Sequence, residues 1–157
     1  MIGGSMINKI LALVFVSCLM SACATTKQAQ ETLTISEYKL KLALADESYL
    51  KKDYTQALSL YSEINQKFAK DPHVLFRMGN IYASSAKPLK AIDAYEGALE
   101  VDKSLTKAWY NLGVVYMQQS GRTWANMSKY ADQNDPLYPS AGHYSRGMLE
   151  LIPPNKN

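Results

Sequence analysis

The sequence predicts an all-α solenoid of three helix-turn-helix units with a C-terminal capping segment. The main observation is that one set of residue types recurs every 34 positions between Tyr38 and Asp132. A fixed period of this size is typical of stacked repeats, in which each unit leaves an apolar face that the next unit covers. Acidic residues and prolines at suitable helix starts support the same fold. A single helical bundle with a chance spacing is the alternative.

Small residues and aromatics carry the period. Small side chains let two helices approach closely, and aromatic rings fill the space toward the next unit. The three units are predicted to span 38–71, 72–105 and 106–135. The equivalent positions are Ala45, Gly79 and Gly113; Ala57, Ala91 and Ala125; Leu44, Met78 and Leu112; Tyr61 and Tyr95; and Tyr82 and Tyr116.

Three stretches resemble the helices of the tetratricopeptide repeat family. Residues 109–116, with the sequence WYNLGVVY, are similar to the first helix of a repeat. Residues 91–99, AIDAYEGAL, resemble the second helix, as do residues 53–61, DYTQALSLY. The resemblance implies three stacked hairpins over residues 35–135.

Six repeat helices are expected, and the first covers about residues 36–51. Thr34 and Glu37 have the spacing of a capping box at its start. Asp53 is placed to cap the second helix, which carries Ala57, Leu58, Tyr61 and Ile64 at helical spacing. In the first helix, the residues expected to face inward are Leu40, Leu44 and Ala45.

The later helices have their own start signals. Asp71-Pro72 opens the third helix, Pro88 opens the fourth, and Ser104 is placed to cap the fifth. Gly121 is expected to interrupt the chain before a sixth helix.

Ala125 keeps the period in that sixth helix, but Lys129 stands where Tyr61 and Tyr95 stood in the earlier units. A terminal unit is expected to be atypical, because its outer face meets solvent.

Residues 136–157 form the predicted capping segment and tail. Pro136 and Pro139 interrupt helical geometry, and residues 140–152 are then expected to be helical. Tyr144, Met148 and Ile152 would lie along one face and cover the end of the stack. An unstructured tail is the alternative.

Residues 1–22 have the pattern of an export signal. Lys9 supplies a positive charge, residues 10–20 are mostly apolar, and small residues precede Cys23. The apolar run is shorter than the roughly 20 residues that span a bilayer as a helix. Residues 23–34 would then form a polar tether with a coil dimension of about 15–20 Å.

Residues 19–23, LMSAC, are similar to the lipobox of bacterial lipoproteins. The resemblance implies cleavage before Cys23, acylation of Cys23, and sorting to the outer membrane, because Ala24 follows rather than Asp. Cys18 would be discarded with the signal, so no disulfide is expected. An ordinary cleavable signal with an incidental thiol is the alternative.

Composition and motifs argue against several function classes. A net charge of +3 from 17 basic and 14 acidic residues is too small and dispersed to indicate nucleic-acid binding. His73 and His143 are far apart and lack the neighbours of a metal site, and His73 is expected to be solvated. No phosphate-binding loop or nucleophile motif is present. We therefore expect no enzyme activity, no cofactor and no small-molecule substrate.

The resemblance implies a concave face that binds a protein partner, lined by the first helix of each unit. Aromatic side chains and methionine would give adaptable apolar contact, and polar residues would orient a partner backbone. Repeat proteins that clamp a terminal carboxylate have a different residue set. At those positions stand Leu42, Asp46, Arg77, Lys107 and Asn111, of which only Lys107 matches. The predicted groove residues are Leu42, Asp46, Tyr49, Phe76, Asn80, Ala83, Lys107, Tyr110, Val114 and Met117.

Together these features predict a lipid-anchored scaffold on the periplasmic side of the outer membrane. The combination is similar to pilotin-like lipoproteins, above all the assembly lipoproteins of tight-adherence (Flp) pili. The implied partner is a secretin or another envelope assembly component. An adaptor for envelope enzymes, such as a peptidoglycan hydrolase or a protease, is the alternative. An enzyme or small-ligand carrier on the same scaffold is the third possibility.

Overall fold

The computed structural model describes residues 34–151, which form helices and no strand. Residues 34–50 are helical and are followed by α2 (Tyr54–Lys67), α3 (Pro72–Ser84), α4 (Pro88–Val101), α5 (Thr106–Tyr130) and α6 (Tyr138–Glu150). The predicted all-α class is therefore confirmed. Within 34–151, every helix is too short or too polar to cross a membrane. The expected export signal and Cys23 lie outside the described residues, as does Ile152.

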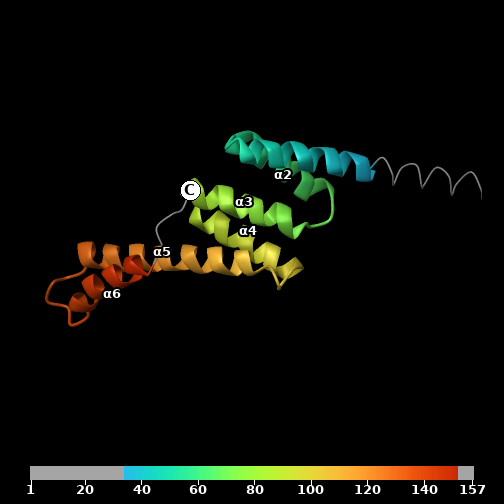
Figure 1. Cartoon of the computed structure of the whole chain (residues 1–157). Coiled ribbons are helices and arrows are strands. Elements are labelled where there is room, and N and C mark those ends of the chain that lie inside the picture. Colours follow the sequence, from blue (N-terminus) through green and yellow to red (C-terminus); the bar gives the residue numbers. More distant parts are fainter. Residues whose placement is uncertain (1–33, 152–157) are drawn as a thin grey trace, which may run out of the picture.

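The helices stack in chain order (Figure 1). Each of α3 to α6 packs on the helix before it, and α3 also contacts α5. The buried residues form two clusters, one in the first unit and its junction with α3, the other around α4 and α5. Tyr61 and Tyr95 are the largest fully buried side chains. The periodic small and aromatic residues thus build the core, as the 34-residue spacing predicts.

Local signals explain most helix starts. Asp53 accepts a hydrogen bond from the amide of Gln56 at 3.1 Å and caps α2. Asp71 accepts from the amides of His73 and Val74 and caps α3. The prolines at the starts of α3 and α4 remove no helix hydrogen bond, because the first amides of a helix have no intrahelical partner.

One predicted cap is wrong. Ser104 does not cap α5; its hydroxyl donates to Asp102 at 2.6 Å, and Leu105 is the residue before the helix. In the first helix, residue 34 is the first described residue and is helical. The carboxylate of Glu37 pairs with Lys67 at 2.6 Å, and this ion pair holds the pKa of Glu37 below its usual value.

The turns inside the first two units share one unusual backbone geometry. Lys52 has φ 61° and Ala86 has φ 54°, one period apart. In each turn, the next amide reaches back to a carbonyl five residues earlier, from Asp53 to Ser48 and from Lys87 to Tyr82. This left-handed helix ending usually contains glycine, because a side chain crowds the backbone there.

Leu40 and Leu44 do not face inward as predicted. Their exposed fractions are 62% and 43%. Their equivalents in the second unit, Val74 and Met78, are buried because the first unit covers them. No described unit precedes the first helix, so the same positions stay open there.

The predicted sixth helix is also wrong, because α5 runs without a break through Gly121 to Tyr130. At the equivalent turns, the chain has the cap Asp53 or the pair Lys87-Pro88 to start a new helix, whereas Arg122 follows Gly121. Glycine alone weakens a helix by only about 1 kcal/mol. The third unit therefore lacks a second helix at the position that the period predicts.

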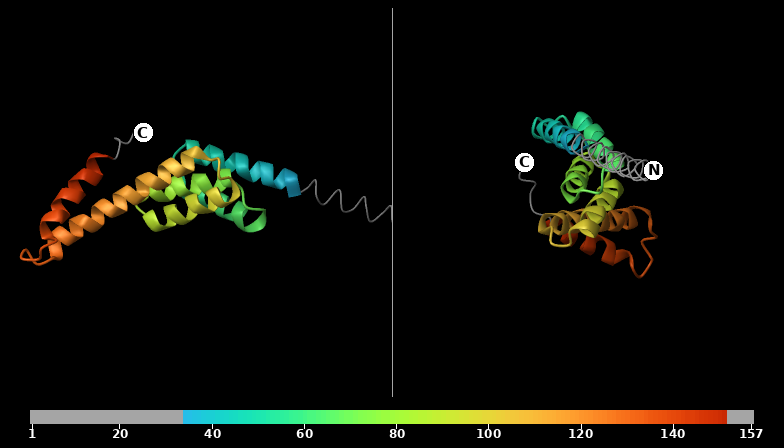
Figure 2. Two further views of the ribbon diagram at one scale, coloured as in Figure 1. Left: turned by 90° about the horizontal axis from the view of Figure 1, so that it is seen from below. Right: turned by 90° about the vertical axis from the view of Figure 1, so that its right-hand side faces the viewer.

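Helix α6 instead packs on the second half of α5 (Figure 2). The rings of Trp124 and Tyr144 lie 4.9 Å apart, and Ala141 is fully buried. The hydroxyls of Tyr138 and Ser145 donate to the carbonyls of Ser128 and Gly121 at 3.3 and 3.5 Å. These contacts fix α6 beyond the part of α5 that lies next to α4.

Replacing Ala86 by glycine should stabilise the protein. Removing the side chain at φ 54° relieves the crowding of a left-handed conformation, and we expect a gain of about 0.5–1 kcal/mol in the free energy of unfolding. Thermal denaturation followed by circular dichroism would measure the shift. As the control, Ser84→Gly replaces the last residue of α3, which lacks a positive φ, and should destabilise because the hydroxyl's hydrogen bond to the Ile81 carbonyl is also lost. A lower midpoint for Ala86→Gly would contradict the account of the turn.

Alanine should have opposite effects at the equivalent glycines 79 and 113. A Cβ on Gly79 would lie 2.5 Å from the buried ring of Tyr95, whereas a Cβ on Gly113 meets nothing within 4 Å. We expect Gly79→Ala to lower the free energy of unfolding by about 1–3 kcal/mol. Gly113→Ala should raise it by about 1 kcal/mol through helix propensity. Urea denaturation checks both, and equal signs would show that α4 does not sit on Gly79.

Candidate functional site

A row of polar contacts, here called the polar ladder, crosses the first helices of successive units. Asp46 on the first helix and Asn80 on α3 are one period apart, and each accepts a hydrogen bond from the tyrosine 15 positions later. Tyr61 donates to Asp46 at 2.5 Å, and Tyr95 donates to Asn80 at 2.9 Å. Each pair ties the first helix of a unit to the second.

The ladder also joins neighbouring units. Asn111 on α5 donates to the Oδ1 atom of Asn80 at 2.8 Å, and Asn80 donates to the Tyr49 hydroxyl at 3.3 Å. At the equivalent position one unit earlier, Arg77 approaches Asp46 at 4.0 Å. Its guanidinium carbon lies 4.4 Å from the centroid of the Tyr49 ring. One amide, Asn80, therefore links the first helix, α3, α4 and α5.

His73 is partly solvated, as expected, and it also belongs to the ladder. Its Nε2 atom lies 3.1 Å from Oδ1 of Asp46, and 43% of its side chain is exposed. Asp46 therefore has Tyr61, His73 and Arg77 around it.

The two tyrosine hydroxyls of the ladder are held in their protonated form. Burial raises the pKa of Tyr95 to about 12. Burial, followed by the hydrogen bond to Asp46, raises the pKa of Tyr61 well above its ordinary value near 10. Both therefore stay donors through the physiological range, and the ladder is a fixed structural element.

The predicted groove residues fall into two groups. Leu42, Tyr49, Phe76 and Ala83 are half-buried and pack against the two core clusters, and Asp46 and Asn80 form the ladder. On α5, Lys107 and Tyr110 are exposed, Tyr110 to 58%, while Val114 and Met117 are half-buried. The exposed part of the predicted groove is thus the start of α5.

Sequence reasoning missed the partners in the ladder. The sequence pattern predicts Tyr61 and Tyr95 only as packing residues. It places Arg77 and Asn111 only at the positions of a carboxylate clamp. Two spacings that repeat with the period were available as signals: 15 residues from acceptor to tyrosine, and 31 residues from Asp46 to Arg77 and from Asn80 to Asn111.

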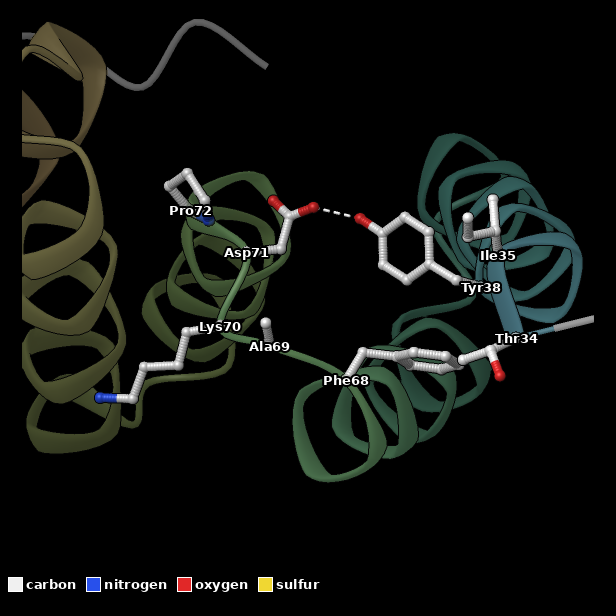
Figure 3. Close-up of a pocket in the computed structure, with 8 residues that line it drawn as sticks. All are labelled: Thr34, Ile35, Tyr38, Phe68, Ala69, Lys70, Asp71 and Pro72. Carbon is white, nitrogen blue, oxygen red and sulfur yellow. Dashed lines mark hydrogen bonds between the residues drawn. The ribbon is translucent and has the colours of Figure 1, made fainter. Parts of the chain in front are cut away.

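An apolar pocket lies at the other end of the stack, between the first helix and the connection from α2 to α3 (Figure 3). The rings of Tyr38 and Phe68 meet edge to face at 5.3 Å, and the Tyr38 hydroxyl donates to Asp71. Burial and this hydrogen bond raise the pKa of Tyr38 to about 12. The lining residues are Thr34, Ile35, Tyr38, Phe68, Ala69, Lys70, Asp71 and Pro72, none of which was predicted for the groove.

Replacing Asn80 by leucine should destabilise the stack, because the buried Tyr95 hydroxyl loses its acceptor. We expect the free energy of unfolding to fall by about 2–3 kcal/mol, measured by urea denaturation. Adding Tyr95→Phe removes the stranded hydroxyl, so the double variant should lose less than the sum of the single losses. Asn126→Leu, at an exposed position on α5, is the control and should be near neutral. Additive losses at 80 and 95 would contradict the ladder.

Comparison with known proteins bears on the same region. Residues 79–120, from α3 through α4 into α5, match the family model described as TPR repeat. The chain is 28% identical over 115 residues to "Photosystem I assembly protein Ycf3" of Acaryochloris marina, a match that covers 72% of this chain and 66% of that protein. It is 37% identical over 65 residues to "Protein O-mannosyl-transferase TMTC3" of Mus musculus, covering 41% of this chain and 6% of that protein.

The chain thus spans just under two thirds of the first relative and a small part of the second. A solved structure, the Sgt2 TPR domain from Aspergillus fumigatus, aligns with a TM-score of 0.49 at 20% identity, covering 77% of this chain and 87% of that one. Residues 34–151 of the chain are all-helical and contain tetratricopeptide-like helix-turn-helix repeats.

Proposed function

We propose that the chain is a non-catalytic scaffold that binds a protein partner across the first helices of its units. The observation that carries the proposal is the polar ladder, which holds the first helix, α3 and α5 in a fixed register and ends beside the exposed Tyr110. A preformed surface loses little freedom on binding, so more of the contact energy appears as affinity. Tyrosine is enriched among residues that dominate interface energies.

The start of α5 would supply the specific contacts. Tyr110 offers a ring and a hydroxyl, Lys107 a positive charge, and Val114 and Met117 half-buried apolar surface on the same side of the helix. This combination suits an extended or helical partner segment with an acidic group near one end.

We further propose that Cys23 is lipidated and holds the scaffold on the periplasmic side of the outer membrane. The lipobox-like sequence and the short polar stretch before residue 34 support this placement. Stable anchoring requires two or more acyl chains. Confinement at a membrane raises the effective concentration of a membrane-bound partner, so a modest groove affinity suffices.

The proposed role is assembly or positioning of a secretin in a pilus or secretion system of the tight-adherence type. One relative is a photosystem I assembly protein, and this similarity supports an assembly role for the chain. An adaptor for envelope enzymes would use the same groove and anchor, and only the captured partner separates the two roles.

Site-specific cross-linking in cells tests the proposal. A photoreactive residue at position 110 should cross-link to a secretin, because Tyr110 is exposed at the end of the ladder. The same residue at position 130, which is 73% exposed on the same helix, is the control and should give no such product. Cys23→Ser, which removes the acylated thiol, should reduce the yield from position 110 at least tenfold.

Each other outcome counts against a named part of the proposal. Capture of a cell-wall hydrolase or a protease at position 110 would favour the adaptor role. Equal products from positions 110 and 130 would contradict the groove. An undiminished yield with Cys23→Ser would contradict the lipid anchor.

A further inference from the structure

Within residues 34–151, a strip of α5 beside the predicted groove has no covering helix. Trp109 and Tyr116 are 55% and 45% exposed, and Gly113 between them is exposed as well. These residues, here called the open strip, recur at a spacing of three to four and so lie on one face of the helix. Only the hydroxyl of Tyr116 reaches α4, where it donates to Glu96 at 2.7 Å, and its ring stays on the open side. The Trp109 ring is held there, since its Nε1 atom donates to the Lys103 carbonyl at 3.0 Å.

The preceding unit shows what covers an equivalent strip. One period earlier stand Leu75, Gly79 and Tyr82 on α3; the first two are buried and the third is half-buried. Helix α4 covers them. The ring of Tyr95 rests on Gly79, and Leu75 lies 3.6 Å from the position that a Cβ on Gly97 would take. The open strip therefore has the residue types on which a helix packs in the second unit, but no helix of residues 34–151 packs on it. We call this uncovered packing surface the seat.

Helix α6 does not fill this seat. Its anchoring contacts are to Gly121, Trp124 and Ser128, all in the second half of α5. Figure 2 shows α6 beside that half and the start of α5 beside α3 and α4. A Cβ added to Gly113 would meet no atom within 4 Å, so the seat is open at its centre.

The chain's own continuation is poorly suited to the seat. If residues 122–130 folded back as the period predicts, Lys129 would lie where Tyr95 lies on Gly79. A lysine in that place would bring a charge into an apolar contact without a partner. The seat is thus present, while the equivalent position of the chain carries Lys129 in place of an aromatic.

Charge at the edge of the seat indicates the direction of the missing helix. Lys70, two residues before α3, pairs with Glu100 near the end of α4 at 3.3 Å. Lys103 and Lys107 flank the start of α5, and no ion pair among residues 34–151 involves either. Exposed pairs of this kind set orientation more than affinity.

We propose that the open strip binds an amphipathic helix of another protein, packed antiparallel on the start of α5 as α4 packs on α3. The recognised helix carries a small residue, an aromatic residue four positions later and an acidic residue near its end, as α4 does with Ala91, Tyr95 and Glu100. This surface differs from the groove, because Tyr110 and Val114 lie on a neighbouring face of α5.

The chain's own fourth helix supplies the probe. A fluorescent peptide with the sequence of residues 87–103 should bind the full-length chain, measured by fluorescence anisotropy. Gly113→Leu places a side chain at the open centre of the seat, where an added Cβ meets no atom within 4 Å, and should weaken binding at least tenfold. Gly147→Leu, at an open glycine on α6, is the matched control and should change binding less than twofold. A peptide with alanine in place of Tyr95 should bind at least tenfold more weakly.

Three results would overturn the proposal. The first is binding that Gly113→Leu leaves unchanged, which would mean that the peptide replaces α4 in its own unit. The second is absence of binding to the parent chain at millimolar peptide concentration. The third is a dimer in sedimentation velocity that Gly113→Leu dissociates, which would make a second copy the occupant of the strip.

Discussion

The contact between the ring of Tyr95 and the backbone of Gly79 sets how closely α4 approaches α3. A single added methyl group at residue 79 would lie 2.5 Å from that ring, so no other residue permits the same spacing without movement. The close approach brings the Tyr95 hydroxyl within 2.9 Å of Asn80. Asn80 in turn accepts from Asn111 and donates to Tyr49, so the register of three units follows from one aromatic–glycine contact.

The 34-residue period predicted the parts of the fold that depend on such contacts. It located the small residues and the buried tyrosines, while capping residues and prolines located the helix starts at Asp53, Asp71 and Pro88. It did not predict the unbroken α5, although Ala125 keeps the period. A second helix forms only where a capping group or a proline starts it and an aromatic holds it. Gly121-Arg122 and Lys129 supply neither.

The sequence predicted which helices carry the candidate site, but not what each side chain contacts there. The period correctly placed Asp46 and Asn80 on successive first helices, yet both use their polar atoms within the chain. Whether a polar side chain on a concave face meets a partner or a neighbouring helix depends on distances between units, which one sequence does not contain. The exposure of a residue on the outermost helix, such as Tyr110, likewise depends on whether another helix packs over it.

A terminal unit of a repeat stack normally turns a polar face to water, because nothing follows to cover apolar surface. Here the last unit has Trp109 and Tyr116 in that position, around a glycine that leaves room for a ring. Helix α6 would be the natural cap, but its contacts with Trp124 and Gly121 hold it farther along α5. Burying an aromatic side chain is worth roughly 1.5–3 kcal/mol, so leaving two of them half exposed forgoes stability that a shifted α6 would supply. An open strip of this composition is therefore better explained by a covering helix from outside residues 34–151 than by the stability of the helices described.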